Sequence, residues 1–136
     1  MTTDGGAKTL KQRAAAAGLL ALTIGAGLAA RYLLAGFWAK YLGVALWATA
    51  AYWCVLFVRP SLSVMRAAAV ALIVSFSVEL FQLSPVPAYL STKHILFRLV
   101  LGTTFSVWDL PAYLVGVGLG AAQHRLTFRF GENDDD

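Results

Sequence analysis

The sequence predicts an all-α integral membrane protein with about four transmembrane helices, and composition and pattern both lead to that prediction. Of its 136 residues, 59% are hydrophobic and only 13% are charged, whereas soluble domains average about 25% charged residues. The mean hydropathy is +0.68. The apolar residues also gather in runs close to the ~20 residues that cross a ~30 Å hydrocarbon core. This composition excludes a soluble enzyme domain and a disordered chain.

The first predicted span covers residues 14–30 and follows a polar N-terminus at residues 1–13, which we expect in the cytoplasm. A basic start before an apolar run also fits a secretory signal peptide. The run is rich in Ala, Gly and Leu throughout and lacks a convincing cleavage site, so a transmembrane helix is favoured. The second span covers residues 41–58, and Pro60 marks its end.

The third predicted span covers residues 67–83, and the fourth runs from about 109 to 124. These four spans form a single transmembrane domain over residues 14–126. An acidic cytoplasmic tail is expected at residues 127–136.

Residues 88–105, between the third and fourth spans, are apolar but contain Lys93, His94 and Arg98. Each Lys or Arg at the centre of a bilayer costs ~2.5–3.5 kcal/mol. We therefore expect an amphipathic helix in the membrane interface or a re-entrant segment buried in protein.

The basic residues predict the orientation. With four spans, the side of the termini carries more Lys and Arg than the other side, so the positive-inside rule places both termini in the cytoplasm. The larger group is Lys8, Lys11, Arg13, Arg59, Arg66, Arg125 and Arg129; the smaller is Arg31, Lys40, Lys93 and Arg98. Since these residues are scattered singly between apolar runs, nucleic-acid binding is not expected.

Two carboxylates within or beside the predicted spans are the main candidates for a site. Glu79 lies one helical turn before the end of the third span, and Asp109 begins the fourth. One loop joins these two ends, so both carboxylates lie toward the same face, the outer one in this orientation. Ionisable residues at such positions are functional candidates by default, although each also has a structural interpretation. Glu79 could pair or hydrogen-bond structurally, and Asp109 could cap its helix.

Neighbouring polar residues extend this candidate site. Ser75, Glu79 and Gln82 share one face of the third helix, and Asp109 and Tyr113 share a face of the fourth. Gln82 is favoured as interhelical glue over a ligand contact, and Tyr113 as an interface anchor. We expect Arg98 first, and Lys93 second, to pair with the carboxylates.

Other chemistry is not indicated. Cys54 is the only cysteine, and neither histidine has a Cys or carboxylate at metal-ligand spacing, so no metal or cofactor is expected. Gly116 and Gly120 have the GxxxG spacing that permits close helix approach, either within the chain or in a homo-oligomer.

Four stretches of the chain resemble the DUF2809 family of small bacterial inner-membrane proteins. They are Tyr41–Trp47, Val78–Leu83, Phe97–Gly102 and Trp108–Gly116. The specific part is Glu-x-x-Gln followed by Asp-Leu-x-x-Tyr-x-x-Gly. This resemblance implies a multi-pass protein of the bacterial inner membrane and brings no established activity. The same order of polar residues is more loosely similar to the VanZ-like membrane proteins linked to glycopeptide resistance.

The functional hypothesis is a polar cluster near the outer face that binds a lipid headgroup or small polar group, or that shapes the fold. It consists of Glu79, Gln82, Arg98, Asp109 and Tyr113, with Ser75 and Lys93 as secondary members. The alternative is a VanZ-like envelope or lipid-related enzyme, or a small transporter, that uses Glu79 and Asp109. Catalysis would need a second titratable group and a cavity, and transport a deeper polar path. Because the sequence indicates neither, the binding or structural role is favoured.

Overall fold

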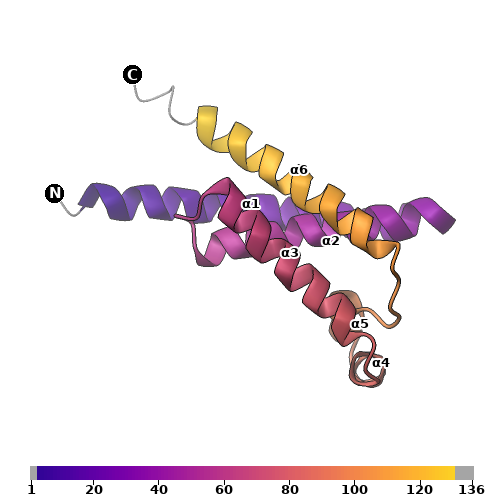
Figure 1. Cartoon of the computed structure of the whole chain (residues 1–136). Helices are drawn as coiled ribbons and strands as arrows, with labels where there is room; N and C mark the ends of the chain where they lie inside the picture. Colours follow the sequence, from indigo (N-terminus) through magenta and orange to yellow (C-terminus); the bar gives the residue numbers. More distant parts are fainter. Residues whose placement is uncertain (1–2, 131–136) are drawn as a thin grey trace.

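A computed structural model describes residues 3–130, with side chains described over residues 4–128, and all regular structure in that part is α-helical. The helices are α1 (Thr3–Leu33), α2 (Gly36–Val58), α3 (Val64–Phe81), α4 (Val86–Ser91), α5 (Ile95–Leu101) and α6 (Asp109–Phe130). In Figure 1, α1 and α2 lie side by side, α3 and α6 cross them obliquely, and α4 and α5 lie at the far end of α3.

Three of these helices are long and apolar enough to cross a membrane: Asp4–Leu33, Gly36–Val58 and Val64–Phe81. They overlap the first three predicted spans, so the prediction of an all-α protein is confirmed for the described residues, and three of its predicted spans coincide with helices able to cross a membrane. Helix α6 has 22 residues but is not among them. Its apolar stretch is interrupted near both ends by Asp109, Gln123 and His124.

Helix α1 begins well before the predicted span at residue 14. It has 31 residues, or ~46 Å at 1.5 Å per residue, which exceeds a ~30 Å hydrocarbon core. The extension is helical because Lys, Leu, Gln and Arg between residues 8 and 13 are good helix formers. Gly36, with φ +61°, then allows the chain to reverse into α2.

Prolines and caps define the later boundaries. Helix α2 ends at Val58, directly before Arg59 and Pro60, and Ser63 caps α3 by accepting the Arg66 N–H. Helix α3 ends at Phe81, two residues before the predicted end at 83. Of the predicted acidic tail, residues 127–130 continue α6, and residues 131–136 lie outside the described part of the chain.

The ambiguous stretch at residues 88–105 lies mostly in two short helices. Helix α4 has 6 residues and α5 has 7, so each is ~9–11 Å long and neither crosses a hydrocarbon core alone. Gly102, with φ +67°, ends α5. The chain then runs through residues 103–108 back to α6.

Helix α2 is the centre of the fold, because it packs against α1, α3 and α6. Its Tyr52, Trp53 and Leu56 are fully or almost fully buried. Small residues of the neighbouring helices let them approach closely. A methyl group on Gly120 would lie 2.8 Å from the Tyr52 ring. Gly116 and Gly120 therefore face α2 of the same chain.

Candidate functional site

Glu79 is fully buried, and both of its carboxylate oxygens are hydrogen-bonded. The backbone N–H of Ser106 donates to Oε1, and the Tyr113 hydroxyl donates to Oε2 over 2.7 Å. One side chain of α3 thus holds both the loop after α5 and the first turns of α6. The two donors satisfy the carboxylate without a basic partner.

Asp109 is buried at the start of α6, where its negative charge interacts favourably with the helix dipole. Its charge partner comes from α2. Lys40 Nζ lies 3.7 Å from Asp109 Oδ1 and 3.5 Å from the Ser106 hydroxyl oxygen. Because Ser106 also contacts Glu79, it links the surroundings of the two carboxylates. Asp109 Oδ1 accepts no hydrogen bond from the described residues.

Gln82 fixes the end of α5, and among the described residues no hydrogen bond joins its side chain to either carboxylate. Its Nε2 donates to the Leu101 carbonyl over 2.6 Å. A methyl group on Gly102 would lie 2.6 Å from that same nitrogen. Gln82 therefore acts as glue between α3 and the end of α5, as the sequence favoured, while its Oε1 is buried without a hydrogen-bond partner among the described residues.

Arg98 and Lys93 lie apart from the carboxylates. Both side chains are exposed, and among the described residues the ion pair recorded is that of Lys40 with Asp109. Lys93 Nζ lies over the Tyr89 ring, 5.0 Å from its centroid. The basic residue beside Asp109 is thus Lys40, not Arg98 or Lys93. Ser75 is buried but bonds within its own helix, to the Ala71 carbonyl.

A second set of polar contacts lies further along the interface between α2 and α6. Tyr52 Oη and His124 Nδ1 share a hydrogen bond of 2.7 Å, and Trp53 Nε1 donates to Gln123 Oε1 over 2.9 Å. Thr49 donates to the Gly116 carbonyl. No pattern within a single helix of the sequence indicates these partners. The available signal was the presence of two polar residues, Gln123 and His124, at the end of an apolar run.

Comparison with known proteins shows the family of this chain. The model of a family described as "Protein of unknown function (DUF2809)" matches residues 33–117. That range includes Glu79, Asp109 and Tyr113 and ends before Gln123 and His124. No curated protein and no solved structure matches the chain.

Proposed function

We propose that this chain, which belongs to the DUF2809 family, is a four-span membrane protein that binds anionic lipid headgroups where α2 begins and α3 ends. One observation supports this most directly: at this end the carboxylates Glu79 and Asp109 are buried, whereas the cations are exposed. The exposed cations are Arg31, Lys40, Lys93 and Arg98. A lipid at this surface would therefore meet positive charge.

The fourth span is α6. Its polar side chains face the other helices, where Asp109 lies near Lys40 and Tyr113 bonds to Glu79. Its exposed face carries apolar residues, among them Leu114 and Val115. The polar residues of α6 lower its mean hydropathy. Because they bond to partners within the protein, much of the free-energy cost of placing them in lipid is removed. This arrangement supports a span at residues 109–124. The excess of Lys and Arg on the side of the termini supports the proposed orientation, with both termini in the cytoplasm of a bacterium.

The carboxylates hold this surface together in our proposal. The set that holds it together differs from the polar cluster predicted from the sequence, and we call it the carboxylate network. It ties α2, α3 and α6 to the loop at residues 103–108 and consists of Glu79, Ser106, Tyr113, Asp109 and Lys40. Both oxygens of the central carboxylate are occupied by hydrogen bonds, which favours the structural role. An enzyme or transporter using that carboxylate would first have to release it from those two donors.

Helices α4 and α5 form the interfacial segment. Exposed apolar side chains on α5 include Ile95, Leu96 and Phe97, and they lie beside the exposed Lys93 and Arg98. Apolar groups next to long basic side chains are typical of helices that lie in the headgroup region. The connection from α5 to α6 is fixed at both ends. Gln82 bonds to Leu101 at the end of α5, and Glu79 bonds to Ser106 shortly before α6.

Lipid selectivity in reconstituted vesicles tests the proposal. Tryptophan quenching by bromine-labelled phosphatidylglycerol is compared with quenching by bromine-labelled phosphatidylcholine. Trp38 and Trp108 are suitable reporters because they are 69% and 70% exposed near this face. The Lys93→Gln/Arg98→Gln variant should lose about five-fold or more of the anionic preference, since each basic residue near a membrane surface contributes about 1 kcal/mol.

The matched control removes two cations from the opposite face, Arg59→Gln/Arg66→Gln, and should leave this preference nearly unchanged at the two reporters. Equal preference in the wild type and the Lys93/Arg98 variant contradicts headgroup binding. A Glu79→Gln variant that keeps its fold and lipid preference but loses a cellular phenotype would instead favour the enzyme or transporter.

A further inference from the structure

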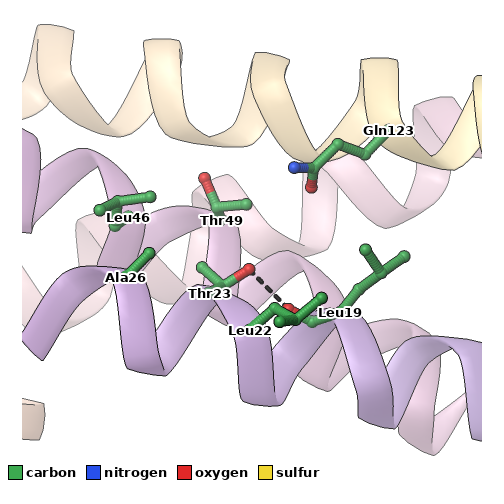
Figure 2. A pocket seen from close by; sticks show the side chains of 7 residues that line it. All are labelled: Leu19, Leu22, Thr23, Ala26, Leu46, Thr49 and Gln123. Carbon is green, nitrogen blue, oxygen red and sulfur yellow. Dashed lines mark hydrogen bonds between the residues drawn. The ribbon is translucent and has the colours of Figure 1, made fainter. Parts of the chain in front are cut away.

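A groove between α1, α2 and α6 lies away from the carboxylates, toward the other end of α6. It has a volume of about 210 Å³ and is lined by Leu19, Leu22, Thr23, Ala26, Leu46, Thr49 and Gln123. Figure 2 shows the side chains of α1 below and the Gln123 amide extending from α6 above. Most of this lining is aliphatic.

The two threonines of the groove are already hydrogen-bonded within the protein. Thr23 donates to the Leu19 carbonyl over 2.6 Å, the bond drawn in Figure 2. Thr49 donates to the Gly116 carbonyl over 2.7 Å. Neither hydroxyl therefore needs an acceptor from a molecule bound in the groove, and the threonines contribute their methyl groups to its lining.

Gln123 differs from the two threonines, because the N–H groups of its side-chain amide donate to none of the described residues. The indole N–H of Trp53 can only donate, so the atom 2.9 Å from it must be the Gln123 oxygen. The amide nitrogen is then turned away from Trp53. Among the described residues it donates no hydrogen bond. An amide N–H without an acceptor is unfavourable in a membrane, so a groove occupant that carries an acceptor is favoured here.

The donor and the apolar lining are arranged along the groove. Gln123 lies two residues before Arg125, about 3 Å along the helix axis, which is close to the headgroup level on that side. Leu46 and Ala26 lie toward the opposite end of the groove in Figure 2. A ligand that fits has an acceptor near the membrane surface and an aliphatic chain directed toward the bilayer centre.

We infer that this groove binds one acyl chain of an ester-linked glycerolipid, with the ester carbonyl accepting a hydrogen bond from Gln123 Nε2. The site uses other residues and the other leaflet from the headgroup surface proposed above. Both proposals rest on α6 as a span, but the lipid contacts of either one can fail without the other. Ordinary lipids around a membrane protein would show no preference for an ester over an ether linkage at this position.

Retention of lipid by the purified protein tests the inference. The full chain is incubated with a diacyl phosphatidylglycerol or with its dialkyl ether analogue, which lacks the carbonyl, and retained lipid is counted by native mass spectrometry. The wild type should retain the diacyl lipid about three- to ten-fold more strongly, the effect of one hydrogen bond. Gln123→Leu should abolish this discrimination.

A second variant fills the groove without touching the polar contacts. Ala26→Phe should lower the retention of both lipids several-fold, whereas Ala29→Phe, at an exposed position of the same helix outside the groove, should not. Equal retention of ester and ether lipid by the wild type overturns the carbonyl contact. Unchanged retention by Ala26→Phe overturns the site, and if this variant instead splits a dimer, the occupant is a second copy of the chain.

Discussion

Replacing Gly116 with alanine would bring a methyl group against the backbone of α2. The new Cβ would collide with the Ala45 carbonyl oxygen, and it would lie 2.8 Å from the Ala45 carbonyl carbon and 2.9 Å from Ala48 Cβ. Since the carbonyl belongs to a helix, it cannot rotate away as a side chain could. The two helices must separate to accept the methyl group.

The expected loss of stability follows from those contacts. Overpacking in a tightly packed interface costs ~1–3 kcal/mol. Separating α2 from α6 also weakens the 2.7 Å hydrogen bond from Thr49 to the Gly116 carbonyl, which is worth about 1 kcal/mol. Gly116→Ala should therefore destabilise the protein by ~2–4 kcal/mol.

Gly118 provides the matched control, because a methyl group there would have no neighbour within 4 Å. Both substitutions gain the same helix propensity of ~1 kcal/mol at most, so the difference between the variants reports the interface. Stability is measured by reversible unfolding in mixed detergent and SDS micelles, followed by far-ultraviolet circular dichroism. If Gly116→Ala and Gly118→Ala unfold at the same SDS fraction, the close packing of α2 and α6 is wrong.

Two further substitutions test the contacts around the carboxylates and the end of α5. Glu79→Gln replaces one acceptor by a donor, which should cost ~1–3 kcal/mol. Combined with Tyr113→Phe the loss should be less than the sum of the two single losses, as a double-mutant unfolding cycle would measure; additive losses contradict the hydrogen bond. Gly102→Ala and Gly36→Ala both place a side chain at positive φ, which costs ~1–3 kcal/mol. In the same unfolding assay Gly102→Ala should lose more, because its ψ of −171° suits glycine almost alone and its methyl group also meets Gln82; equal losses would contradict this account of Gly102.

The helical architecture was largely predictable because hydropathy and prolines act locally. Three predicted spans overlap helices that are long and apolar enough to cross a membrane. Helix α1 begins before the predicted span, because the polar residues before position 14 form helix readily although they are unsuited to the hydrocarbon core. Hydropathy reports where a helix meets lipid and says little about where it begins in water.

The partners of the candidate residues were harder to predict, because they depend on how the helices pack. The sequence predicts Glu79 and Asp109 as candidates, and the cations expected beside them are those nearest along the chain. Lys40 is 69 positions from Asp109 in sequence, and the parallel packing of α2 and α6 brings it within 3.7 Å. Tyr52 and His124, separated by 72 positions, meet for the same reason. No periodicity within one helix contains that information.

The spanning role of α6 can be tested directly, and both proposed lipid sites depend on it. Reporter fusions after Arg13, Ser61, Pro87 and Arg129 should give cytoplasmic signals at the first, second and fourth sites and an external signal at the third. The physical reason is that α6 presents apolar residues outward while its polar side chains bond to α2 and α3. An external signal after Arg129 would contradict the four-span topology. The polar contacts of α6 would then belong to a helix outside the hydrocarbon core, where water could replace them.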